Sequence, residues 1–117
     1  MEDNKYQEVY IRSYESILGP GVKTKQNFNI PIEREFEINF IIFYCENSGT
    51  FEIRFDGLKN AFENPIVIYD SVMNQLIPFD PHPIAISGTS GLNITNLTNA
   101  EATLNYMLVG KIQQRKR

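Results

Sequence analysis

Residues 35–40 read Glu35-Phe36-Glu37-Ile38-Asn39-Phe40, and the same alternation of polar and apolar side chains returns at Phe51-Glu52-Ile53-Arg54-Phe55. A third alternating run lies near the C-terminus, at Ala102-Thr103-Leu104-Asn105-Tyr106-Met107-Leu108. Alternation with a period of two is typical of β-strands that have one buried and one solvated face. We expect the following side chains to face the core: Phe36, Ile38, Phe40, Phe51, Ile53, Phe55, Leu104, Tyr106 and Leu108.

Short apolar runs separated by turn residues continue along the rest of the chain. The strand that starts at residue 35 becomes apolar on both sides through Cys45, which predicts that it enters a covered position. Turn signals such as Asp56-Gly57 and Gly88-Thr89-Ser90-Gly91 divide the later runs. About seven to nine short strands at this spacing predict an all-β fold, a two-sheet antiparallel sandwich that is jelly-roll-like.

The 117 residues are enough for one domain with a core of its own. Within this single β-sandwich domain, we expect residues 1–20 to be an extended N-terminal arm, because Gly19-Pro20-Gly21 is a strong break. Residues 21–110 then form the sandwich core, and residues 111–117 form a short basic tail. The arm would either pack on its own domain or reach a neighbouring molecule.

The charge is distributed unevenly along the chain. The net charge is −3, but no Lys or Arg occurs from Asn60 to Gly110. The central parts of protein interfaces are depleted of charged residues. This half of the chain is therefore a candidate contact region, with a neutral surface rich in Asn, Thr and Ser as the alternative.

Within this range, the residues in and after a loop with three closely spaced prolines are the strongest candidates for such a contact. Pro78, Pro81 and Pro83 surround His82, and three prolines so close together exclude a central strand, because each removes a backbone donor. A rigid loop loses little entropy when it docks on a partner. The interface hypothesis names these residues: Pro81, Pro83, Ile84, Ile86 and Leu92.

The residue inventory argues against an enzyme or a metalloprotein. Cys45 and His82 are the single cysteine and the single histidine, whereas zinc sites need several such ligands. Glu35 and Glu37 share one strand face at a spacing that a glycosidase could use, but a solvated strand face explains them as well. We expect no catalytic residues, no metal and no cofactor.

Nucleic acid and membranes are also not expected as partners. The tail holds the four cations Lys111, Arg115, Lys116 and Arg117, which are too few to predict direct binding of nucleic acid. The N-terminus lacks the basic and apolar regions of a signal peptide. The apolar run from Phe40 to Cys45 is too short to span a bilayer.

The last third of the chain resembles a known class of proteins. Ile84-Ala85-Ile86 and Gly88-Thr89-Ser90-Gly91 precede a closing hairpin over residues 92–110. This hairpin resembles those of small all-β structural proteins of tailed bacteriophage virions, including capsid decoration (cement) proteins and tail-associated proteins. The resemblance implies a non-enzymatic virion protein, made in the host cytoplasm, that stabilises contacts between capsid subunits.

The same resemblance implies particular partners. They would be the major capsid protein or tail proteins, together with further copies of the chain in a homo-oligomer, with a homotrimer preferred. Two alternatives remain open. One is a tail- or fibre-associated virion protein. The other is a carbohydrate-binding β-sandwich module with Tyr69, Tyr44 or Phe79 as exposed stacking platforms.

Overall fold

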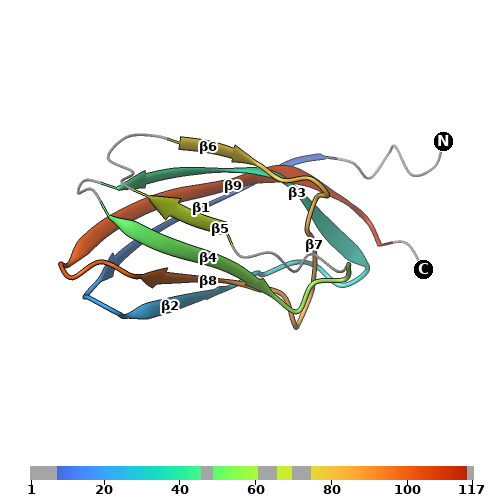
Figure 1. Ribbon diagram of the computed structural model, residues 1–117. Helices are drawn as coiled ribbons and strands as arrows, with labels where there is room; N and C mark the ends of the chain where they lie inside the picture. Colours follow the sequence, from blue (N-terminus) through green and yellow to red (C-terminus); the bar gives the residue numbers. More distant parts are fainter. Residues whose placement is uncertain (1–7, 46–48, 61–65, 70–74, 116–117) are drawn as a thin grey trace.

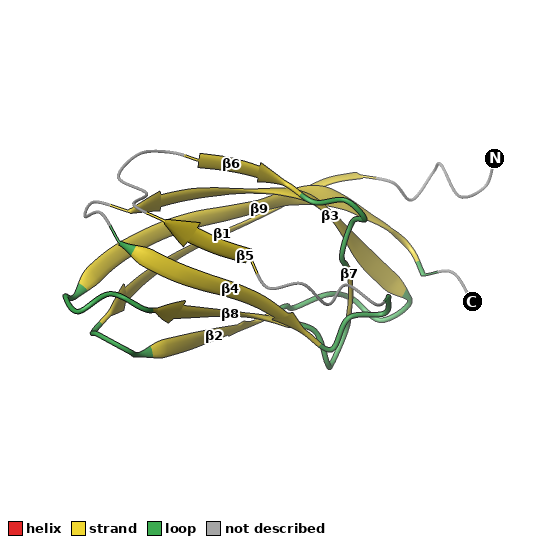
Figure 2. Cartoon of the chain, in the orientation of Figure 1, coloured by secondary structure: helices red, strands yellow, loops and turns green. Residues whose placement is uncertain are grey.

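Among the residues that the computed structural model describes, every regular element is a β-strand (Figure 2). The structure describes residues 8–45, 49–60, 66–69 and 75–115. In these ranges it contains β1 (Glu8–Leu18), β2 (Lys23–Asn27), β3 (Arg34–Cys45), β4 (Thr50–Asp56), β5 (Ile66–Tyr69), β6 (Gln75–Pro78), β7 (Ile84–Ile86), β8 (Gly91–Asn96) and β9 (Ala102–Gln114). Within this described part, no helix is long and apolar enough to cross a membrane.

The strands form two antiparallel sheets, which appear as two layers in Figure 1. One sheet has the order β1-β9-β3-β6, with β7 also paired to β3, and the other has the order β2-β8-β4-β5. Along the chain, the first strand thus pairs with the last, β2 with β8, β3 with β6 and β7, and β4 with β5. This nested pairing is a long hairpin wound into two sheets, so the predicted sandwich of jelly-roll type is confirmed.

Aromatic side chains from both sheets meet in the core between them. The Phe43 and Phe51 ring centroids lie 5.5 Å apart, and Phe36 meets Phe28 edge-on at 6.1 Å. Edge-on and tilted contacts of this kind add to the free energy gained by burial. All the side chains expected in the core are buried except Phe40, which is half-buried.

Phe40 faces outward because β3 contains a bulge. The register between β3 and β9 shifts between Ile38 and Phe40, so Asn39 is an extra residue on β3. Beyond it Ile41 and Phe43 are fully buried, while Phe40 and Ile42 lie on the outer side. The prediction that Phe40 faces the core was therefore wrong, because it continued the alternation through the bulge.

The bulge also divides the neighbouring edge strand into β6 and β7. The Phe79 amide donates to the Asn39 carbonyl at 2.9 Å, and the Ile38 amide donates to the Pro83 carbonyl at 2.9 Å. Pro78 ends the edge strand β6, and Pro81 and Pro83 lie in the loop between β6 and β7. As predicted, the prolines therefore stay out of a central strand.

Gly110 on β9 lies opposite Ile38, where the two backbones come close. A Cβ atom at position 110 would lie 1.9 Å from the Glu37 carbonyl oxygen. Real Cβ atoms do not approach backbone that closely, so this position requires glycine. The close approach holds β9 and β3 together beside the bulge.

Both ends of the chain contribute more to the sheet than expected. Residues 8–18 of the predicted arm form β1, which pairs with β9 along its whole length and so packs on its own domain. The first four residues of the predicted tail belong to β9, which continues to Gln114. Residues 1–7 and 116–117 lie outside the described residues.

Asn96 joins two turns at one end of the sandwich. Its fully buried side-chain amide donates to the carbonyls of Leu18 at 3.0 Å and Ala100 at 2.9 Å. Its side-chain oxygen accepts a hydrogen bond from the Thr98 amide at 2.9 Å. The turn after β1 and the turn after β8 are therefore tied to one side chain, and the buried amide is satisfied.

The bulge predicts different costs for two neighbouring isoleucines. We expect Ile41→Ala to lower the free energy of unfolding by about 2–5 kcal/mol, because it opens a cavity in the core. We expect Ile42→Ala to cost about 1 kcal/mol or less, because that side chain lies on the outer face. Urea unfolding of both variants measures the difference. Equal costs, or a larger cost at Ile42, would contradict the bulged register.

Candidate functional site

The outer face of the five-stranded sheet carries two adjacent rows of mostly apolar side chains. The first row runs across the four paired strands through Ile11, Val109, Phe40 and Pro78, and the second through Ser13, Met107, Ile42 and Leu76. Directly opposed side chains on one face of a sheet touch each other. We call the apolar members of both rows the apolar face: Ile11, Phe40, Ile42, Leu76, Pro78, Met107 and Val109.

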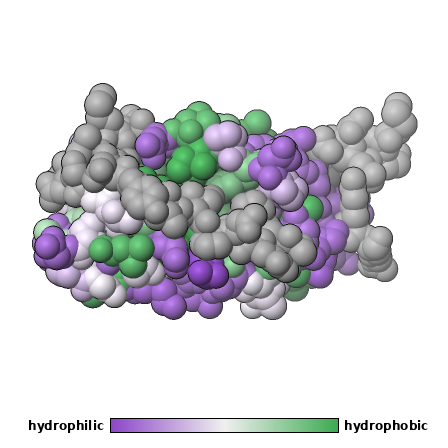
Figure 3. All heavy atoms as spheres, in the orientation of Figure 1, coloured by the Kyte–Doolittle hydropathy of each residue, from purple (hydrophilic) through white to green (hydrophobic). Residues whose placement is uncertain are grey.

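Much of the apolar face is accessible to solvent. Ile11 is 52% exposed and Leu76 is 57% exposed. Phe40, Ile42 and the two β9 side chains of the apolar face are half-buried. Figure 3 shows hydrophobic surface gathered along the upper side of the molecule, where β6 and β3 lie in the view of Figure 1. Contiguous apolar surface on a soluble domain is typical of a contact site for another molecule.

Polar residues border the apolar face on both sides. Beyond the first row, Glu37 and Lys111 lie opposite each other on β3 and β9, with the apolar Val9 of β1 and Ile84 of β7 at the two ends of the row. Beyond the second row, Glu15 lies opposite Asn105 on β1 and β9. An apolar centre with a polar rim is the arrangement found in protein interfaces.

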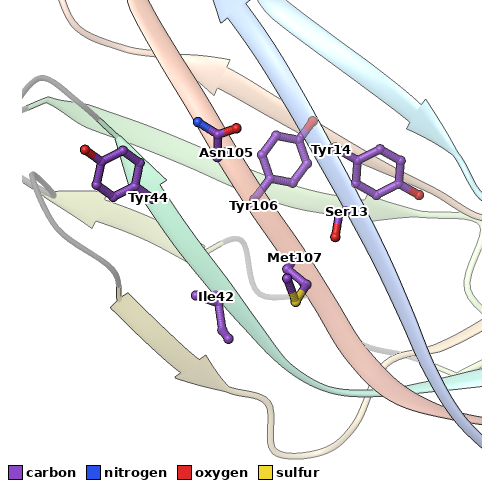
Figure 4. A pocket seen from close by; sticks show the side chains of 7 residues that line it. All are labelled: Ser13, Tyr14, Ile42, Tyr44, Asn105, Tyr106 and Met107. Atoms are coloured by element: carbon purple, nitrogen blue, oxygen red, sulfur yellow. The ribbon is translucent and has the colours of Figure 1, made fainter.

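A shallow hollow of about 260 Å³ lies at one end of the apolar face (Figure 4). Sites for small molecules and cofactors are larger, about 300–1,000 Å³. It is lined by Ser13 and Tyr14 from β1, Ile42 and Tyr44 from β3, and Asn105, Tyr106 and Met107 from β9.

The two tyrosines Tyr14 and Tyr106 lie side by side on β1 and β9. Burial raises the pKa of Tyr106, and the hydrogen bond with Ser16, 3.1 Å between the two hydroxyl oxygens, acts in the opposite direction. Burial is also the main cause of the raised pKa of Tyr14. Both phenols therefore lose their protons less readily than a free tyrosine, and both side chains pack on the core side of their strands.

A polar cluster lies at the edge of the same sheet, beside the proline segment. His82 Nδ1 is 2.9 Å from Glu37 Oε2 and 3.2 Å from the Asn39 side-chain nitrogen. The His82 carbonyl accepts a bond from the Asn60 amide at 2.8 Å. These contacts fix the loop between β6 and β7 on β3, which gives the single histidine a structural role.

Glu35 does not share the environment of Glu37. Its side chain is buried, with Lys59 Nζ at 2.8 Å and Gln113 Nε2 at 2.9 Å. A buried carboxylate that forms an ion pair and accepts an amide hydrogen bond is held in a fixed position. Both glutamates are thus engaged by side chains of the fold, Glu35 by Lys59 and Gln113 and Glu37 by His82.

The residues named in the interface hypothesis differ in how deeply they are buried. Pro81 is exposed, whereas Pro83 is buried. Ile84 and Ile86 are half-buried on β7 and pair with Glu37 and Glu35 of β3. The remaining member, Leu92, is fully buried in the core, which leaves no side-chain surface for a partner, so it is removed from the interface.

Of the three aromatic side chains proposed as platforms for a carbohydrate, the structure describes two. Phe79 is buried at 3% exposure and meets Phe55 edge-on, so it is not an exposed platform. Tyr44 is half-buried and lines the hollow. The side chain of Tyr69 lies outside the described residues.

Sequence reasoning missed the apolar face itself. Its residues come from four strands, and the rows become visible when the strand register is known. The doubly apolar run Phe40 to Cys45 was the available signal. It was interpreted as a strand covered on both sides, but its outer side remains partly exposed.

No family model and no curated protein matches the sequence. Among solved structures, a family two carbohydrate esterase from Cellvibrio japonicus is similar, with 12% sequence identity and a TM-score of 0.46. The match covers 95% of this chain and 36% of that chain, so the chain spans about a third of its length. A likeness at this level supports no conclusion about function.

The raised pKa values predict the response to alkali. The unfolded phenol titrates near 10.0, so above that pH the unfolded state loses its proton before the folded state does. The free energy of unfolding should then fall as the pH rises further. Tyr106→Phe should cost about 1 kcal/mol at pH 7 by losing the Ser16 bond, and should make the alkaline fall less steep. Urea unfolding between pH 7 and 11 measures both effects, and identical slopes in the two proteins would contradict this account.

Proposed function

We propose that this chain is a non-enzymatic structural protein of a virion, a capsid decoration protein that stabilises contacts between capsid subunits. The observation that carries the proposal is the apolar face, a rigid and partly exposed surface with a polar rim. Its occupant is the surface of another shell protein with the same character, an apolar centre bordered by polar groups. Burial of this face against the shell drives attachment.

The setting of the apolar face favours a large partner. Its side chains are held by cross-strand neighbours on a sheet, so little side-chain freedom is lost when a partner docks. The rows follow four strands and make a broad surface rather than a cleft. A broad surface matches another folded protein better than it matches a small molecule.

The interior supports a role in binding rather than in chemistry. Among the described residues, every buried side-chain nitrogen or oxygen has a hydrogen-bond partner. The polar side chains of Glu35, Glu37 and His82 each contact a neighbouring side chain of the fold. A structural protein that acts through its surface likewise needs no unpaired polar group in its interior.

The virion setting rests on the resemblance of the closing hairpin and on the lack of cations over residues 60–110. That range includes β5, β6, β7, β8 and most of β9, and β6 and β9 both contribute to the apolar face. A tail- or fibre-associated position would use the same surface. The homotrimer that the resemblance implies stays a prediction.

The test is the presence of the chain in purified virus particles. Particles from cells that produce the chain are sedimented through sucrose, and their proteins are quantified by mass spectrometry. The proposal predicts that the chain sediments with the particles in a fixed ratio to the main shell protein. A chain that stays wholly in the supernatant would contradict the virion role.

Two leucine variants test the surface. Leu76→Lys places a charge on the apolar face, and we expect it to reduce the particle-bound amount by about tenfold or more. Leu97 is 51% exposed in the turn before β9, away from this face, so Leu97→Lys is the matched control and should bind like the wild type. Equal binding of both variants would contradict attachment through the apolar face.

A further inference from the structure

β1 is an edge strand whose outer edge is open. In the part of the chain that the structure describes, it pairs with β9 over all 11 residues from Glu8 to Leu18 and has no second strand partner. An edge strand presents a row of backbone donors and acceptors that another strand can use. A strand of 11 residues offers a long template for such pairing.

Of the devices that commonly protect an edge, β1 has charged side chains, at Glu8, Arg12 and Glu15, but it lacks several others. One edge strand of the other sheet, β2, has five residues, of which Lys23 and Lys25 are exposed lysines. β1 contains no Lys or Pro, and its register with β9 is continuous, without a bulge. Lysines, prolines, bulges and short length are common means of blocking edge pairing.

The outward side chains of β1 are mostly apolar. Val9 is 75% exposed, Ile11 is 52% exposed and Ile17 is 63% exposed. An open, long and apolar edge promotes aggregation unless a defined partner covers it. A second strand that pairs with this edge would cover it.

We propose that β1 pairs antiparallel with β1 of a second copy of the chain, around a two-fold axis perpendicular to the sheet. This inference concerns self-association alone and depends neither on the virion role nor on the homotrimer that the resemblance implies. The contact joins the two five-stranded sheets into one. Because the axis is perpendicular to the sheet, the apolar faces of both copies lie on the same side.

The symmetry restricts the register of the two strands. Opposed residues on antiparallel strands point to the same face, so an outward residue must pair with an outward residue. Ser13 is the middle residue of β1, and a register centred on it pairs all 11 residues. Val9 then lies opposite Ile17 of the second copy, which forms two apolar pairs across the axis.

The charges favour the same register. With Ser13 at the axis, Arg12 lies opposite Tyr14 of the second copy, a pair that combines a cation with an aromatic ring. Within its own chain, the Arg12 guanidinium already lies 4.7 Å from the Tyr10 ring centroid. A register centred on Arg12 would place two guanidinium groups opposite each other, and like charges directly opposed destabilise a sheet.

A two-fold contact closes at two copies, whereas a trimer needs a contact between two different surfaces. The edge of β1 is self-complementary, so it favours a dimer over the homotrimer that the resemblance implies. The mass of the chain in solution separates these possibilities.

Charged variants at the axis provide the test. Ser13 is exposed, so Ser13→Lys and Ser13→Glu should fold, and thermal unfolding checks this. Sedimentation velocity should show two copies for the wild type, one copy for each variant alone, and two copies again for an equal mixture of the variants. The mixture restores pairing because Lys then faces Glu across the axis. We expect at least tenfold weaker self-association for each variant alone.

Other results would overturn the proposal. A wild-type protein that sediments as one copy up to millimolar concentration, or as three copies, would contradict the β1 pair. Charge variants that associate like the wild type would also contradict it. A mixture that stays at one copy would contradict the register centred on Ser13. The particle-binding comparison of Leu76→Lys and Leu97→Lys is independent of these outcomes, so the two proposals can fail separately.

Discussion

The single extra residue on β3, Asn39, is the constraint on which the rest of the structure depends. By interrupting the alternation, it turns Ile41 and Phe43 into the core and leaves Phe40 and Ile42 outside. Its carbonyl accepts the Phe79 amide, which anchors the proline segment at the sheet edge. A bulge is a local kink in one strand, yet here it determines both the composition of the core and the character of one outer face.

The outer face explains why assembly is a reasonable function for this fold. Each square ångström of apolar surface removed from water contributes about 25 cal/mol, so a partner that covers the apolar face gains free energy without any chemistry. The five-stranded sheet presents that face on one side and the open edge of β1 at its margin. One surface can thus meet a shell while the edge meets a second copy, and the two contacts do not compete for the same atoms.

Several features could be predicted from sequence because they follow from local periodicity. Phe36, Ile38 and Leu104 alternate with polar neighbours, and all three are in the core. Phe40 could not be placed, because the bulge at Asn39 depends on backbone contacts with Gly110 and the loop that contains Pro83, residues far apart in sequence.

The candidate site shows the same limit. Leu92 follows a glycine-rich turn and resembled a contact residue, yet it alternates with Ile94 toward the core. Rows across four strands depend on register, which one strand's sequence does not contain.

The most direct test of the central claim, that protein contact covers the apolar face, is oxidation of Met107, which lies in that face on β9. Mass spectrometry after mild peroxide treatment should find Met107 oxidised in the free chain and at least tenfold slower in particle-bound chain, as expected when a thioether is covered. Equal oxidation rates in the two states would contradict the account.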